Sequence, residues 1–218
     1  MSLAIFDLDN TLIAGGSDHA WGDYLIDLGL VDGAAHRHAN DAFYQDYLAG
    51  TLDIQRYLEF ALQPLARFPL EQLLIWRQTF IEQRIRPLLL PDALALLQRH
   101  RGLGHTLLII TATNRFITEP IATLLGVDDL IATDPEMRDG HFTGRISGIP
   151  SYRQGKVTRL ETWLLDHPHD LTQAHFYSDS HNDIPLLEQV GHPVAVDADP
   201  TLLETARRRG WPTLSLRS

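Results

Sequence analysis

Two aspartates stand one residue apart near the start of the chain, directly after a short run of apolar, strand-forming residues. Residues 3–12 are LAIFDLDNTL, so Asp7 and Asp9 fall where a buried strand would end. Side chains alternate along a strand, which places both carboxylates on the same side. Two ionised carboxylates about 4 Å apart repel by roughly 4 kcal/mol at an effective dielectric of 20, so a divalent cation would stabilise them. Oxygen ligands of this kind favour Mg²⁺.

A second acidic pair lies far along the chain, in the stretch SDSHND at residues 178–183. Asp179 ends another predicted strand, and Asp183 follows after a turn. In an open parallel sheet the ligands gather at the carboxyl ends of the strands. If the two strands are neighbours, Asp7, Asp179 and Asp183 can bind one hard cation.

A hydroxyl and a lysine lie between the acidic pairs in the sequence. The predicted strand at 110–114, ITATN, carries Thr111 and Thr113 at its end, and RQGKV at 153–157 places Lys156 just inside a predicted helix. A hydroxyl and the backbone N–H groups beyond it can donate hydrogen bonds to phosphate oxygens, and a lysine supplies a compact positive charge. The pattern therefore indicates a phosphate-binding site beside the carboxylates.

The elements that must position these residues are short β-rich runs separated by helical stretches. The runs cover residues 3–8, 105–113, 175–179 and 193–198. Continuous apolar strands joined by helix-length segments predict a parallel sheet covered on both faces, because each crossover needs a dozen or more residues. We therefore predict an α/β fold with a Rossmann-like parallel-sheet core.

Roughly 90 residues separate the first two strands, far more than one crossover requires. Within this segment, apolar residues recur at spacings of three and four, which predicts helices. We expect a helical-bundle cap domain over residues 14–86, and a catalytic core made of residues 1–13 and 87–218.

The composition narrows the class of partner. The chain of 218 residues has 28 acidic and 18 basic residues, and a net charge of −10 argues against binding to nucleic acid or to an anionic membrane. No apolar stretch is long enough to predict a membrane span, and no signal-peptide pattern is present. The absence of cysteine fits a reducing compartment. We expect a cytoplasmic protein with a small-molecule partner, and the sequence predicts no oligomeric state.

The eleven histidines raise the question of a zinc site. His167 and His169 flank a proline in a predicted loop, and His36 with His38 lack further ligands at metal spacing. The sequence pattern therefore predicts no histidine metal site, and we expect the histidines to occupy surface positions.

The ordered set of motifs resembles the haloacid dehalogenase superfamily of phosphatases. Its four motifs are matched by the stretch Asp7-Leu8-Asp9-Asn10-Thr11, by Thr111, by Lys156, and by Asp179 with Asp183. The resemblance also covers the helical insertion, a predicted hairpin at 139–144 and the stretch at 180–187, so it spans nearly the whole chain. One position departs from the pattern. Ser178 stands where a glycine often precedes the last motif, and we expect a local adjustment there.

The resemblance implies a Mg²⁺-dependent phosphomonoesterase that forms an aspartyl phosphate on a small phosphate ester. It assigns Asp7 as nucleophile and Asp9 as general acid and base. Thr111, the N–H of Ala112 and Lys156 would hold the phosphoryl group. The competing interpretations are a phosphotransferase and a non-catalytic phosphate-binding module, and the presence of both aspartates disfavours the second.

The resemblance also implies the ligands of the metal. Mg²⁺ would be held by Asp7, the main-chain carbonyl of Asp9 and Asp179. Asp183 would orient a metal-bound water or Lys156. Asn182 would act as a further phosphate or outer ligand.

The substrate must be inferred from the insertion. The chain most resembles the branch that contains phosphoserine phosphatases, in which an arginine after a G-x-L stretch pairs with the substrate carboxylate. Anchored on Gly50-Thr51-Leu52, that position falls on Glu59, although Arg56 lies less than one helical turn away. A glutamate would repel a carboxylate and attract an ammonium.

The same branch includes histidinol-phosphate phosphatases, whose substrate has an amine and an imidazole and no carboxylate. Asp18, near the start of the insertion, is a candidate partner for the amine. We therefore expect L-histidinol phosphate as substrate, in histidine biosynthesis, ahead of phosphoserine or another small phosphate ester.

Overall fold

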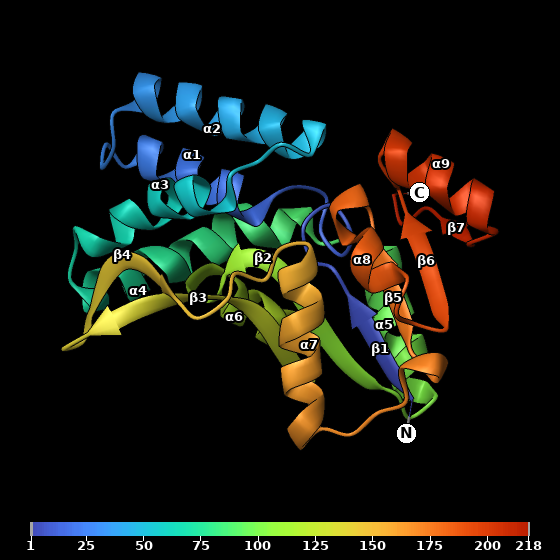
Figure 1. Cartoon of the computed structure of the whole chain (residues 1–218). Coiled ribbons are helices and arrows are strands. Elements are labelled where there is room, and N and C mark those ends of the chain that lie inside the picture. The colour runs from blue at the N-terminus through green and yellow to red at the C-terminus, as the bar shows by residue number, and fades with distance from the viewer. Residues whose placement is uncertain (1, 218) are drawn as a thin grey trace.

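A computed structural model describes residues 2–217 and shows an α/β fold built on one seven-stranded sheet (Figure 1). The strand order is β4-β3-β2-β1-β5-β6-β7, and all neighbours are parallel except the antiparallel hairpin of β3 and β4. The strands are β1 (Leu3–Phe6), β2 (Thr106–Asn114), β3 (Asp129–Arg138), β4 (His141–Ser147), β5 (His175–Ser178), β6 (His192–Val196) and β7 (Thr213–Leu214). The predicted α/β class with a mainly parallel sheet is confirmed.

Alternate residues of the central strand face opposite helical layers. Ala4 and Phe6 pack into one apolar cluster, and Leu3 and Ile5 pack into the other. The first cluster contains α5 (Pro91–Gly102) and α6 (Arg115–Leu125), and the second contains α7 (Gln154–Asp166), α8 (Ile184–Leu187) and α9 (Pro200–Arg209). Both faces of β1 are therefore buried, as its continuous apolar sequence predicts.

Four helices occupy the long segment between β1 and β2. They are α1 (Ser17–Asp27), α2 (Gly33–Ala49), α3 (Ile54–Ala66) and α4 (Leu70–Phe80), and a π-helical turn at Ile81–Ile85 and a 3-10 turn at Arg86–Leu88 follow them. The Asp53 carboxylate caps α3 by accepting the N–H groups of Gln55 and Arg56. Figure 1 shows α3 beside β4 of the core. The predicted helices are thus present, and their grouping as a cap domain over residues 14–86 remains a prediction.

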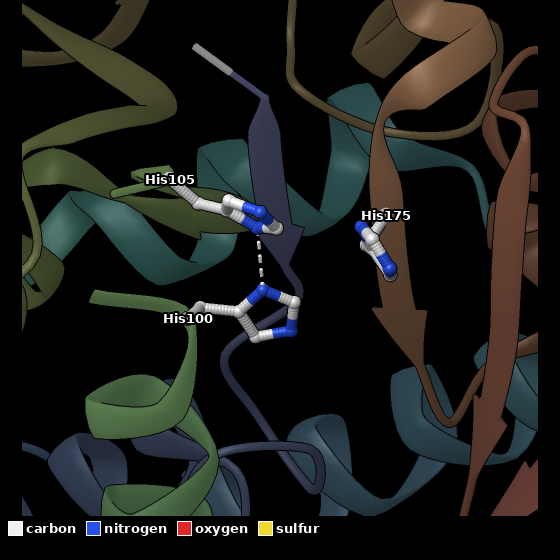
Figure 2. Close-up of side chains that lie close together, drawn as sticks. All are labelled: His100, His105 and His175. Carbon is white, nitrogen blue, oxygen red and sulfur yellow. Dashed lines mark hydrogen bonds between the residues drawn. The ribbon is translucent and has the colours of Figure 1, made fainter. Parts of the chain in front are cut away.

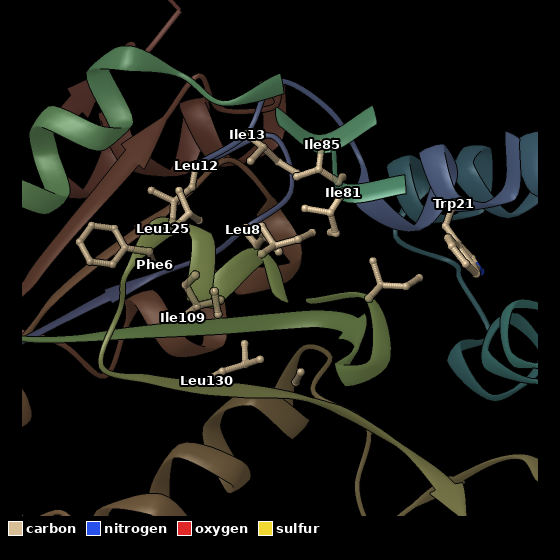
Figure 3. Packing of buried hydrophobic residues seen from close by; sticks show 14 of the residues in the cluster. Phe6, Leu8, Leu12, Ile13, Trp21, Ile81, Ile85, Ile109, Leu125 and Leu130 are labelled. Atoms are coloured by element: carbon tan, nitrogen blue, oxygen red, sulfur yellow. The ribbon is translucent and has the colours of Figure 1, made fainter. Parts of the chain in front are cut away.

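Aromatic packing fixes the first inserted helix against the core. Trp21 of α1 is 2% exposed, and its ring meets those of Phe80 and Phe116 edge-on, with centroids 5.1 and 5.9 Å apart. Figure 3 shows Trp21 in the same cluster as Leu8 and Ile13, which follow β1. The start of α1 is therefore held at a defined place above the end of β1.

The sheet register brings distant parts of the sequence to one edge. β1 lies between β2 and β5, and Phe6 aligns with Ile109 on one side and with Tyr177 on the other. The residues that follow these three strands consequently leave the sheet side by side. The predicted site residues Asp7 and Asp179 lie there, and Thr111 lies within β2 near its end.

Candidate active site

A buried lysine bridges two of the predicted carboxylates. Lys156 Nζ donates hydrogen bonds to Asp7 Oδ1 at 3.0 Å and to Asp183 Oδ2 at 2.7 Å, and all three residues are at most 5% exposed. Burial lowers the pKa of Lys156, but the two carboxylates raise it by more, so the ammonium stays charged. Lys156 therefore binds the nucleophile candidate directly in this structure.

The buried carboxylates around Lys156 carry more negative charge than its single ammonium can neutralise. Burial raises the pKa of Asp7 to about 7, with Asp183 and Asp9 adding to the rise and Lys156 opposing it. Burial and the charge of Asp7 also raise the pKa of Asp179 well above its usual value. Asp179 is held by Thr11, whose hydroxyl donates to Asp179 Oδ1 at 3.0 Å and accepts its N–H at 3.1 Å. The carboxylates of Asp7, Asp179 and Asp183 fit a divalent cation that prefers oxygen ligands.

The second aspartate of the first motif points to a different set of partners. Asp9 Oδ1 accepts the N–H of Ser17 at 2.6 Å, and Asp9 Oδ2 accepts the hydroxyl of Thr113 at 2.8 Å. Burial raises the pKa of Asp9, and these two hydrogen bonds oppose the rise. The carboxylate is thus fixed between the end of β2 and the start of α1. Sequence analysis placed Thr113 at the strand end but gave it no role.

Ser178, the residue that departs from the family pattern, contacts the acidic cluster. Its hydroxyl donates to Asp183 Oδ2 at 2.7 Å and accepts the N–H of Ser180 at 3.1 Å. Asp183 Oδ2 therefore receives hydrogen bonds from both Ser178 and Lys156. Ser178 therefore supplies a side-chain hydrogen-bond donor that a glycine at this position would lack.

A cavity of about 340 Å³ lies between the strand ends and the inserted helices. Eight of the ten predicted site residues line it, and they are Asp7, Asp9, Asp18, Thr111, Ala112, Lys156, Asn182 and Asp183. Asp179 does not line the cavity, but the charges of Asp7 and Asp183, which do line it, act on the Asp179 carboxylate. The structure thus gathers the core motifs around one space.

Asp18 lies in the part of the cavity formed by the inserted helices. Its Oδ2 accepts the hydroxyl of Tyr57 at 2.6 Å, and its Oδ1 accepts Nδ2 of Asn114 at 3.2 Å. Burial raises the pKa of Asp18 to about 6, although the hydrogen bond from Tyr57 lowers it. Above about pH 6 the ionised Asp18 carboxylate places a negative charge in this wall of the cavity.

The prediction that Glu59 faces the cavity is wrong. Glu59 is exposed and lines a second, smaller cavity with Arg145 of β4. Tyr57 of the same helix faces the main cavity, and two residues of α-helix turn by about 200°, so Glu59 points away. Arg56 is also exposed and is not among the residues that line the main cavity.

Several cavity residues were missed by sequence analysis. Tyr47 donates its hydroxyl to Ser180 Oγ at 2.7 Å, and Tyr152 donates to Asn182 Oδ1 at 3.0 Å. Arg153 Nε also donates to Asn182 Oδ1, at 2.8 Å. These contacts fix Asn182 in the cavity wall. Tyr47 interrupts the face of an inserted helix and was an available signal, because a tyrosine hydroxyl needs a polar partner when buried.

The fold and this site together define the class of protein. The family model of haloacid dehalogenase-like hydrolases matches residues 4–188, and the chain belongs to this family. The resemblance inferred from the motifs is thereby confirmed. No helix among residues 2–217 combines the length and the hydropathy needed to cross a bilayer.

Individual relatives refine this assignment. The chain is 45% identical over 220 residues to a histidinol-phosphatase of Neisseria meningitidis serogroup C (strain 8013), with 99% of each chain covered. A crystal structure of a protein of unknown function from Bordetella pertussis Tohama I superposes with a TM-score of 0.92 at 43% identity, covering 99% of this chain and 98% of that one. A phospho-aspartyl intermediate analogue of phosphoserine phosphatase superposes with a TM-score of 0.73 at 19% identity, covering 99% and 93%, which shows a shared fold.

Proposed function

We propose that this phosphoric monoester hydrolase converts L-histidinol phosphate to L-histidinol, with Mg²⁺ as cofactor. One observation carries the choice of substrate. Among the described residues that line the cavity, Lys156 is the only lysine or arginine, and it is engaged by Asp7 and Asp183. The space near the inserted helices offers a substrate the Asp18 carboxylate and aromatic rings instead. The relative named histidinol-phosphatase, 45% identical over nearly the full chain, supports the same substrate.

The donor set fits a magnesium ion. The residues that would hold it are Asp7, the main-chain carbonyl of Asp9, Asp179 and Asp183. Their burial and mutual repulsion leave negative charge that Lys156 alone does not neutralise. When bound, Mg²⁺ would neutralise charge on the carboxylates and on the phosphoryl oxygens.

Asp7 is the proposed nucleophile. Its Oδ1 is bound by Lys156, which leaves the second carboxylate oxygen to attack phosphorus as the ester P–O bond breaks. The product of this step is a phosphate bound to Asp7. The hydroxyl of Thr111 and the N–H of Ala112 would donate to the phosphoryl oxygens, and Asn182 would donate from the other wall.

Asp9 is the proposed proton carrier. Its burial raises the pKa, which favours a protonated carboxyl that can donate to the leaving alkoxide. The resulting carboxylate then accepts a proton from water, whose oxygen attacks phosphorus and frees Asp7. Ser17 and Thr113 hold Asp9 in one orientation, so both proton transfers use the same side chain.

Asp18 and the neighbouring rings are the proposed specificity determinants. Histidinol phosphate presents an ammonium that the Asp18 carboxylate can bind, and an imidazole that can pack on Phe43 or Tyr57. Phosphoserine carries a carboxylate as well, which Asp18 would repel in a desolvated space. The inserted helices over residues 14–86 would act as the cap that supplies these contacts.

The test is a comparison of kcat/KM for the two phosphate esters with Mg²⁺ present. We expect faster turnover of histidinol phosphate, with one inorganic phosphate released per histidinol formed. A higher kcat/KM for phosphoserine would reject the substrate assignment. Transfer of the phosphoryl group to an added alcohol, in place of phosphate release, would identify a phosphotransferase.

A further inference from the structure

Three histidines from separate chain segments meet at the end of the sheet that lies opposite the carboxylates. His100 lies near the end of α5, His105 directly precedes β2, and His175 is the first residue of β5 (Figure 2). Roughly 20 Å of strand separates His105 from Thr111 at about 3.3 Å per residue. The group is therefore distinct from the active site.

The ring nitrogens of this group are close enough to share one ion. Each histidine offers one ring nitrogen as a ligand, and these three nitrogens all lie within 4.8 Å of one another. The Nδ1 atoms of His100 and His105 are 2.8 Å apart and share a hydrogen bond, seen as the dashed line in Figure 2. A tetrahedral ion with 2.0–2.1 Å bonds needs nitrogens about 3.3 Å apart, a spacing that lies between the 2.8 Å of this pair and the 4.8 Å limit of the group.

Two further contacts prepare the rings for coordination. His100 Nε2 lies 2.8 Å from the Tyr177 hydroxyl, which can accept its N–H and so leave a lone pair on Nδ1. His175 Nδ1 is buried and has no hydrogen-bond partner within residues 2–217. A buried nitrogen without a partner is costly, and a metal ion would satisfy it.

We propose that His100, His105 and His175 form a binding site for a divalent transition-metal ion of the Zn²⁺ class. Imidazole nitrogens suit zinc, and a site without carboxylates disfavours Mg²⁺. The ring proton shared by His100 and His105 would move to Nε2 of His105, so that both Nδ1 atoms offer lone pairs. The ion would connect α5, β2 and β5 and stabilise the folded chain.

The electrostatic surroundings agree with this geometry. Burial lowers the pKa of His100 and that of His175 to about 4, and neighbouring histidines and Arg99 contribute to both shifts. Neutral imidazole is the form that coordinates metal. The expectation that the histidines occupy surface positions is wrong for His100, which is 3% exposed.

The experiment is a Zn²⁺ titration of the metal-stripped full chain with excess Mg²⁺ present to occupy the carboxylates. We expect one Zn²⁺ per chain, and a rise in Tm of about 5 to 10 °C at Zn²⁺ concentrations near one hundred times Kd. His105→Ala should weaken Zn²⁺ binding by about a hundredfold, since one of three ligands is lost. His141→Ala, at an exposed histidine of the β3–β4 hairpin, is the matched control and should leave binding unchanged.

A second measurement separates this site from the active site and from misfolding. Co²⁺ bound to three histidines should give visible absorption bands in wild-type protein and in Asp7→Asn, but not in His105→Ala. Circular dichroism and phosphatase activity of His105→Ala should match wild type, because His105 is partly exposed and far from the cavity. Zn²⁺ binding that survives His105→Ala and disappears in Asp7→Asn would overturn the proposal, as would the absence of stoichiometric binding.

Discussion

The two ends of the central strands carry different chemistry on the same framework. At the carboxyl end, buried carboxylates crowd around Lys156, and burial, with their mutual repulsion added, raises the pKa of Asp7 to about 7. At the amino end, the rings of His100, His105 and His175 meet. The first group offers carboxylate oxygens and suits a hard cation with phosphate, whereas the second offers imidazole nitrogens and suits a softer ion. A parallel sheet thus provides two independent places where distant residues converge.

The largest effect should come from removing the proposed nucleophile. Asp7→Asn keeps the shape of the side chain but removes the carboxylate that we propose attacks phosphorus. We expect kcat/KM for histidinol phosphate to fall by at least about 10⁴-fold. Zn²⁺ binding at the histidine end should stay the same, which would show that the two ends are independent. Phosphate release above one hundredth of the wild-type rate would contradict the assignment of Asp7.

Variants at the two ends of the central strands should also lose different amounts of folding stability. Lys156→Met leaves Asp7 and Asp183 buried without their cation, and removing one partner of a buried ion pair costs about 3 to 5 kcal/mol. At the histidine end, His105→Ala removes a neutral hydrogen bond, which is worth about 1 kcal/mol. Urea unfolding in metal-free buffer measures both changes.

The double variant Lys156→Met, Asp183→Asn provides the internal control. It removes one of the two stranded charges, so it should recover part of the lost stability. Equal losses of unfolding free energy for Lys156→Met and His105→Ala would show that the carboxyl end holds no excess of buried negative charge.

The acidic motifs could be predicted because each stands at the end of a strand and these strands are parallel. The carboxyl ends of parallel strands share one edge of the sheet, and Asp7, Thr111 and Lys156 reach one cavity there. Glu59 was misplaced because its orientation depends on helix rotation, and an alignment error of two residues turns a side chain by about 200°. The histidine cluster was missed for a different reason. His100 and His175 are 75 positions apart, and no local spacing reports a contact of that kind.

Within the cavity, Asp18 and Glu59 offer a direct contrast between a wall residue and a surface residue. Asp18→Asn should lower kcat/KM for histidinol phosphate by about 30-fold, mainly through KM, because a charge-assisted contact to the ammonium is worth about 2 kcal/mol. Glu59→Gln should change it less than twofold, since Glu59 lines the other cavity. A larger effect of Glu59→Gln than of Asp18→Asn would reject the pocket assignment.

The pH dependence of the same variant isolates the Asp18 charge. Its pKa of about 6 means that the carboxylate is protonated below that pH, so the ratio of wild-type to Asp18→Asn kcat/KM should approach one there. Because the pKa of Asp18 is raised above its unfolded value of 3.8, protonated Asp18 contributes folding stability at low pH. This contribution is lost as the pH rises through 6. Asp18→Asn should therefore stabilise the protein at pH 7.5, by about 1 to 3 kcal/mol. Thermal unfolding at pH 4 and at pH 7.5 measures the difference.

Among the residues assigned to the active site, the smallest effect should come from Ser178, whose hydroxyl holds Asp183 without lining the cavity. Ser178→Ala removes one donor to a carboxylate that Lys156 still binds, so the loss should be near 1.5 kcal/mol, or about tenfold in kcat/KM. A positioning residue of this kind also shifts metal dependence, so the Mg²⁺ concentration for half-maximal activity should rise. Ser178→Thr retains the hydroxyl and should recover that midpoint if its methyl group fits. If Ser178→Ala leaves both kcat/KM and the Mg²⁺ midpoint unchanged, Lys156 alone orients Asp183, and the serine only fills space beside the strand.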